Sequence, residues 1–153
     1  MQIHPIRLKP NTDLRKALED FTDNTQCSAG FIVSAVGSLK SACLRMAGAS
    51  QTITVEGPFE IFALNGTLCQ DGVHIHIGLS NQHGTCIGGH LCHGSIVYTT
   101  AEIIIGSSSK HTFTRIHDVA TGYPELVIEA HQAIQAKGQA SKPKTTVASD
   151  PLE

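Results

Sequence analysis

Residues 73–80 read V-H-I-H-I-G-L-S, and this alternation constrains the fold more than any other part of the chain. A period of two is typical of a β-strand, in which successive side chains point to opposite faces. The isoleucines and the leucine then share one face, and His74 and His76 share the other. The segment therefore predicts a sheet with one apolar face and, on the opposite face, two imidazoles close enough to share a metal ion.

The turn after this strand predicts where the next strand pairs. Residues 81–85, N-Q-H-G-T, suit a three-residue hairpin loop in which Gly84 takes the left-handed conformation after a type I turn. If the residues that flank this loop pair with each other, His76 lies opposite His90. Both then face the same side as His74, and the three imidazoles converge.

Other loop lengths give a different register. A loop of two or four residues would pair His90 with Ile75 and turn it to the other face, unless Gly88 and Gly89 form a bulge that restores the register. These two glycines are also what a close approach of the backbone to a site requires.

Three neutral imidazoles suit zinc and, less selectively, other first-row divalent ions. An isolated H-x-H is more often the polar face of an exposed strand, but a third histidine in cross-strand register favours a metal site. We therefore predict zinc or another divalent metal ion bound by His74, His76 and His90, with a fourth position open to water or a ligand. Cys92 lies two residues after His90 and would face the same side of the strand, so it could be a fourth ligand. The role of a buried free thiol is favoured for it. The remaining histidines are assigned to the surface, namely His4, His83, His93, His111, His117 and His131.

The rest of the chain predicts mainly strands. Apolar runs of strand length occupy residues 2–8, 29–39, 42–47, 53–55, 59–68, 94–105 and 111–117, with a break expected at Gly37 and Ser38. One helix is expected from the apolar spacing of Leu14, Ala17, Leu18 and Phe21, capped by Asn11 and Thr12, with Asp13 near its positive end. Residues 125–128 fit either a strand or the start of a helix running to residue 136.

Composition and length indicate one globular domain. The chain has 153 residues, of which 41% are hydrophobic and only 16% charged, far from a disordered composition. After residue 136 the sequence shifts to Gly, Ser, Lys, Pro and Thr, which cannot form a core. We expect an α+β fold with a mostly antiparallel sheet over residues 1–136 and a disordered tail over residues 137–153.

Charge and cysteine content bear on partners and location. The formal net charge is −2 and the cations are scattered, which argues against binding nucleic acid by phosphate neutralisation. The five cysteines show no C-x-x-C spacing and suit core positions in a reducing compartment. The first ten residues lack an apolar signal segment, and no window approaches the ~20 apolar residues that span a bilayer. A cytoplasmic protein without a membrane partner is expected.

Several segments in order resemble the PPC family, the plant and prokaryote conserved domain. They are GFIVSAVGSL (residues 30–39), EGPFEIF (56–62), DGVHIHIGLSNQHG (71–84), GGHLCHGSIVYTTAEIII (88–105) and ATGYPEL (120–126). The resemblance covers roughly residues 5–130 and is to the stand-alone prokaryotic branch. It implies an antiparallel sheet flanked by helices, a homotrimer, and metal ligands in H-x-H and GGH, which here are His74, His76 and His90.

Plant members of the family carry an AT-hook, R-G-R-P, which enters the DNA minor groove. This chain has no R-G-R-P, and Lys142-Pro143-Lys144 matches it poorly. Pro58 also stands where the plant segment matching residues 57–62, used there for protein contacts, has an arginine. The resemblance therefore implies a regulatory or DNA-associated role only weakly.

Two classes of function remain open. The first is a trimeric metal-binding module with a small-molecule or protein partner. Trimerisation is also suggested by residues 30–39 and 94–105, which carry more apolar surface than one helix can cover. The second is a zinc-dependent enzyme that acts on a small molecule through a metal-bound water, with Glu60 and Glu102 as candidate bases or supporting partners.

Overall fold

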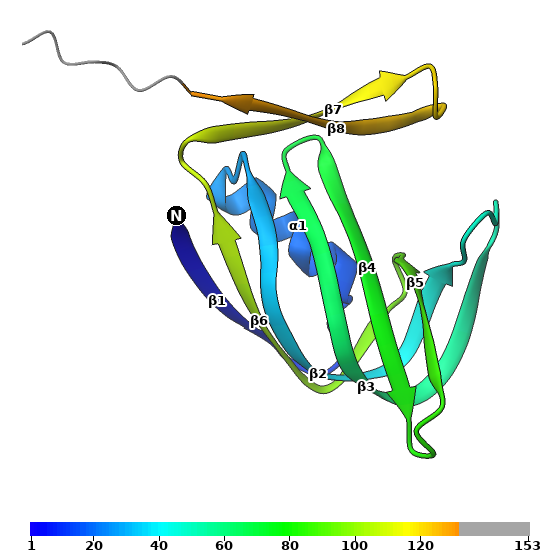
Figure 1. Cartoon of the computed structure of the whole chain (residues 1–153). Coiled ribbons are helices and arrows are strands. Elements are labelled where there is room, and N and C mark those ends of the chain that lie inside the picture. The colour runs from blue at the N-terminus through cyan, green and yellow to red at the C-terminus, as the bar shows by residue number, and fades with distance from the viewer. Residues whose placement is uncertain (132–153) are drawn as a thin grey trace, which may run out of the picture.

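The structure, a computed structural model, describes residues 1–131, and the predicted tail at residues 137–153 lies outside this range. The elements are β1 (Gln2–Leu8), α1 (Leu14–Thr25), β2 (Gly30–Arg45), β3 (Thr52–Cys69), β4 (Gly72–Asn81), β5 (Cys86–Leu91), β6 (Ile96–Ser107), β7 (His111–Asp118) and β8 (Tyr123–Ala130). Six strands form an antiparallel sheet in the order β1-β6-β2-β3-β4-β5, and β7 and β8 form a separate two-stranded sheet (Figure 1).

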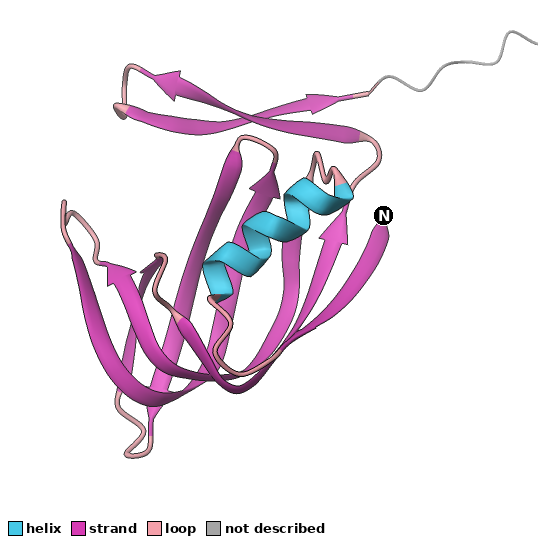
Figure 2. Cartoon of the chain, turned by 180° about the vertical axis from the view of Figure 1, so that it is seen from behind, coloured by secondary structure: helices cyan, strands magenta, loops and turns pink. Residues whose placement is uncertain are grey.

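The main sheet closes partly on itself. The end of β2 pairs with β5 as well, through Leu44 opposite Leu91 and Arg45 opposite His90. Strands β2 to β5 thus form a nearly closed unit, and the whole sheet curls around α1 (Figure 2). Because α1 lies inside the curve, its Leu14 and Leu18 are fully buried against the apolar faces of the strands.

The helix begins one residue later than its expected caps imply. Asp13, not Asn11 or Thr12, is the N-cap, and its carboxylate accepts hydrogen bonds from the backbone N–H of Lys16 (3.1 Å) and of Gly94 (2.6 Å). The second bond ties the helix start to the loop before β6, which sequence spacing does not reveal. The family resemblance implies several helices beside the sheet, but within residues 1–131 α1 is the one α-helix. No helix of that range is long and apolar enough to cross a membrane.

The break expected at Gly37 and Ser38 is wrong, because β2 runs through it as one 16-residue strand. The pairing register of β2 with β6 shifts there instead, between Gly37 and Leu39 and again between Leu39 and Ser41. Gly37 has φ +140, and a Cβ at this position would lie 2.3 Å from the Thr100 carbonyl oxygen. The glycine therefore marks a bulge with close strand approach rather than a strand end.

Residues 123–130 form strand β8, which decides between the two alternatives left open by periodicity. Every residue of β7 pairs with one of β8, from His111 opposite Ala130 to Asp118 opposite Tyr123. The hairpin crosses one end of the main sheet, near the turn between β3 and β4 (Figure 1). Its position matters because the tip of the hairpin reaches the site described next.

Candidate metal centre and its pocket

The loop between β4 and β5 has the three residues that the sequence predicts. Asn81 and Thr85 flank it, with a 3.0 Å hydrogen bond from Asn81 N to Thr85 O, and Gly84 has φ +76. The Asn81 side-chain oxygen also accepts from the backbone N–H of His83 and of Thr85, which closes the turn locally. The two- and four-residue loops are thereby excluded.

The register that follows brings the three histidines together. His76 lies opposite His90, and the candidate ligand atoms of His74, His76 and His90 all lie within 4.8 Å of one another. Their ring centroids are 5.0 to 5.7 Å apart, and the Nε2 atoms of His74 and His76 are 3.2 Å apart. Two nitrogens bound tetrahedrally to zinc at 2.0–2.1 Å would be ~3.3 Å apart, so the set fits the ion with small side-chain adjustments.

The surroundings of His74 and His90 favour the neutral, metal-binding form of their imidazoles. Burial, together with the neighbouring imidazoles and arginines, lowers the pKa of His90 from 6.5 to about 4. The pKa of His74 is also lowered, chiefly by burial and then by His76 and Arg115. His90 Nδ1 is buried and has no hydrogen-bond partner among the described residues. A neutral imidazole with an unsatisfied buried nitrogen, as at His90, is a suitable donor for a divalent ion.

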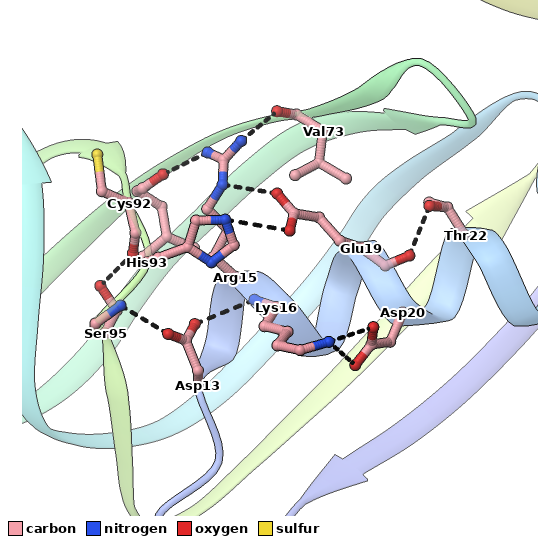
Figure 3. Close-up of polar contacts among 12 residues, drawn as sticks. Asp13, Arg15, Lys16, Glu19, Asp20, Thr22, Val73, Cys92, His93 and Ser95 are labelled. Carbon is pink, nitrogen blue, oxygen red and sulfur yellow. Dashed lines mark hydrogen bonds and ion pairs between the residues drawn. The ribbon is translucent and has the colours of Figure 1, made fainter.

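The guanidinium of Arg15 on α1 lies between Val73 of β4 and the segment around Cys92 that follows β5 (Figure 3). Its Nη1 donates to the Leu91 carbonyl (2.7 Å) and its Nη2 to the Val73 carbonyl (3.3 Å). Its Nε pairs with Glu19 at 2.9 Å, and Nη1 lies 3.4 Å from His90 Nε2. Arg15 thus bridges the backbones of β4 and β5, the strands that carry His74 and His90.

A pocket of about 360 Å³ lies on this side of the histidines. Its walls come from five parts of the fold, namely α1, β2, the start of β4, β5 and the hairpin β7–β8. The charged and aromatic lining residues are Arg15, Arg45, Asp71, His74, His90, Arg115, Tyr123 and Glu125. A second depression, of about 520 Å³, is lined by His76, His90, Met46 and Gly88 among others. His74 thus borders the first space, His76 the second, and His90 both.

The other candidates from the sequence lie elsewhere. Glu60 on β3 pairs with Ser80, at the end of β4 remote from the pocket, and Glu102 on β6 pairs with Arg7 on β1. Neither glutamate lines either space beside the histidines. The Cys92 thiol donates to the His90 carbonyl (3.6 Å) and is not among the clustered ligand atoms. None of the six histidines assigned to the surface belongs to the cluster.

Sequence reasoning missed Arg15, Arg45, Arg115 and Glu125, which lie beside the histidines. No local motif indicates them, since each comes from a different element. For Arg45 one signal exists in principle: it lies directly opposite His90, but only through the β2–β5 pairing. That pairing joins segments about 45 residues apart and follows from curvature of the sheet.

Comparisons with known proteins agree with this architecture. A family model described as the Plants and Prokaryotes Conserved (PCC) domain matches residues 1–109. A hypothetical protein of Salmonella enterica has a similar structure, with 36% identity, a TM-score of 0.83 and coverage of 86% of this chain and 95% of that one. A metal-containing protein of Archaeoglobus fulgidus follows with 25% identity, a TM-score of 0.70 and coverage of 83% and 94%.

A curated relative is much longer than the matching region. The bifunctional protein GlmU of Synechococcus sp. (strain JA-3-3Ab) is 45% identical over 129 residues, which is 84% of this chain and 21% of that protein. The chain thus spans about a fifth of the length of the curated relatives it matches.

Proposed function

This chain belongs to the Plants and Prokaryotes Conserved domain family, and we propose that it is a metal-binding module in which His74, His76 and His90 hold one zinc or similar divalent ion. The observation that carries this proposal is the convergence of three imidazoles from two paired strands. The similar protein of Archaeoglobus fulgidus, described as metal-containing, supports it. When bound, such an ion would supply a Lewis acid, and three protein ligands would leave it a position for water or a ligand.

The test is metal content. We expect close to one zinc or similar ion per chain in the purified protein, and loss of that ion in the triple variant His74→Ala, His76→Ala, His90→Ala. A matched control replaces three exposed histidines, His83, His117 and His131, and should keep its metal. Equal metal content in the two triple variants would reject the assignment.

We also propose a homotrimer. Exposed apolar side chains on the strands support association: Val33 and Val36 on β2 are 52% and 56% exposed, and Phe62 on β3 is 59% exposed. Tyr98 on β6 adds a further half-exposed ring. Light scattering at micromolar concentration should give three times the monomer mass, and a monomeric mass would contradict the proposal.

A metal-dependent enzyme acting on a small molecule is the second candidate, and one observation favours it. Glu125 and Asp71 bring carboxylates into the pocket that contains His74 and His90, where a general base would have to lie. If the metal-loaded protein hydrolyses an ester or phosphodiester, Glu125→Gln should abolish that activity without changing the metal content. If no such substrate is turned over, the binding module remains.

DNA binding is not part of this proposal. Lys and Arg total 11 against 13 Asp and Glu, so phosphate contacts would work against a net negative charge. We expect no submicromolar binding to an A·T-rich duplex at physiological salt, measured by titration against a G·C control. A preference for the A·T duplex that survives deletion of residues 138–153 would contradict this expectation.

We place the protein in the cytoplasm. The five cysteines are free thiols, as suits a reducing compartment. Two of them, Cys27 and Cys69, are buried as expected for core residues, whereas Cys86 is exposed.

A further inference from the structure

Three arginines converge on the pocket beside the histidines from three different elements. Arg15 comes from α1, Arg45 from the end of β2 and Arg115 from β7. All three side chains are only partly exposed, so part of the water around their guanidinium groups has been removed. Desolvated positive charge is costly unless a negative group faces it.

Within residues 1–131, such a negative group is paired with only one of them. Arg15 pairs with Glu19. Among residues 1–131, neither Arg45 nor Arg115 forms an ion pair. Arg45 moreover lies directly opposite His90 on the paired strand, which places it on the same face as the imidazoles.

Arg115 is held in position and still has a free donor. Its backbone N–H donates to Asp71 Oδ2 (3.0 Å), and its Nη2 donates to Thr67 Oγ1 (2.9 Å). Its Nε, by contrast, is buried without a hydrogen-bond partner among the described residues. A fixed guanidinium with an unsatisfied donor is suited to a carboxylate or phosphate, whose oxygens can accept two of its N–H groups.

The net positive charge of the pocket also favours binding of an anion. Its lining holds three arginines against two carboxylates, Asp71 and Glu125. A divalent ion at the histidines would raise the positive charges to five against two, within a space of about 360 Å³. That space equals roughly a dozen waters at ~30 Å³ each, enough for a small metabolite.

We propose that the pocket binds a small molecule bearing a carboxylate or phosphate, with this oxyanion on Arg45 and Arg115 and the remainder of the ligand directed toward the ion held by the histidines. Only the placement of the rest of the ligand near the ion rests on the proposed metal site. Binding of the oxyanion by Arg45 and Arg115 is argued from contacts that do not involve the ion.

The experiment is calorimetric titration of the zinc-loaded protein with inorganic phosphate and with succinate, at constant ionic strength to remove general screening effects. We expect saturable binding of at least one anion with a dissociation constant of roughly 1 mM or below. The double variant Arg45→Gln, Arg115→Gln should weaken it about tenfold or more, as loss of charge-assisted hydrogen bonds predicts. The control Arg7→Gln removes an exposed arginine on β1, far from the pocket, and should not change the affinity.

Metal content is measured in the same samples, so the two proposals fail separately. If the double variant keeps one zinc per chain but binds the anion as well as the unmodified protein, or if the unmodified protein binds neither anion, the arginine pocket is wrong and the metal site stands. If the chain holds no metal but still binds an anion in a manner that depends on Arg45 and Arg115, the pocket stands and the metal site is wrong. If the heat of titration depends only on salt concentration and is equal in all variants, the inference is wrong.

Discussion

Two hairpins meet at the pocket, and they are held in place very differently. Hairpin β4–β5 is paired on both sides, with β3 next to β4 and β2 next to β5, and its Ile75 and Leu79 are fully buried. Hairpin β7–β8 is a two-stranded sheet by itself, and its Ile116 and Ile128 are 57% and 58% exposed. The first hairpin carries His74, His76 and His90, whereas the second carries only lining residues of the pocket.

A few polar contacts hold the second hairpin against the body of the protein. They include Phe113 N to the Ser28 carbonyl (2.8 Å) and the two bonds from Arg115 to Asp71 and Thr67. An isolated two-stranded hairpin is marginally stable, so these contacts matter for its position. The core therefore holds the candidate ligands for the ion in place, whereas hairpin β7–β8, the opposite wall of the pocket, can open with a small free-energy change.

The largest expected effect is on global stability. Ile75→Ala removes a fully buried side chain of β4 and should lower the free energy of unfolding by about 2–5 kcal/mol. Ile116→Ala, at an exposed position of β7, should change it by no more than about 0.5 kcal/mol. Chemical denaturation of both variants measures the difference. Similar losses would show that the two hairpins belong to one core after all.

A smaller effect concerns pH in the metal-free chain. The pKa of His90 is about 4 in the folded state and ~6.5 when unfolded, so the unfolded chain takes up the proton first. The contribution of His90 to stability is therefore complete above pH ~6.5 and is lost as the pH falls to about 4. Because His90 is partly open to water, we expect a loss on the order of 1–2 kcal/mol rather than the full value for the shift.

Denaturation curves at a series of pH values measure this loss. His90→Gln should flatten the decline between pH ~6.5 and 4, whereas His117→Gln, on the exposed second hairpin, serves as the matched control. An unchanged slope in His90→Gln would contradict the lowered pKa of His90.

The smallest effect should appear in the second hairpin alone. Asp71→Ala removes the carboxylate that accepts the Arg115 backbone N–H, at a cost of about 1 kcal/mol in local stability. Hydrogen exchange of β7 and β8 amides should then accelerate about fivefold while that of β4 and β5 stays constant. Asp23→Ala, at an exposed position of α1, is the control. Acceleration in both hairpins would mean that they open together.

Much of the histidine cluster follows from local sequence. The alternation at residues 73–80 predicts strand β4. The loop at residues 81–85 predicts the pairing of His76 with His90, because turn type and loop length set the register of a hairpin without a bulge. The family resemblance agrees with the match to residues 1–109. Whether an ion occupies the cluster stays a prediction.

Where sequence reasoning failed, the deciding contact was distant in the chain. The cap residue Asp13 is also held by a bond from Gly94, and β2 continues through Gly37 because β6 follows it around the bulge. Neither contact leaves a trace in the local pattern. Periodicity likewise left residues 125–128 open, and pairing with β7 decided for the strand.

The sequence by itself thus determined which face of β4 carries imidazoles, since side-chain alternation and hairpin register are local properties of the backbone. Only the tertiary structure decided what surrounds them. Arg15, Arg45 and Arg115 reach the pocket because the sheet curls until β2 meets β5, the helix packs inside the curve, and the last hairpin folds across its end. The curling of the sheet and the packing of helix and hairpin depend on burying apolar surface over the whole chain, and no short segment encodes them.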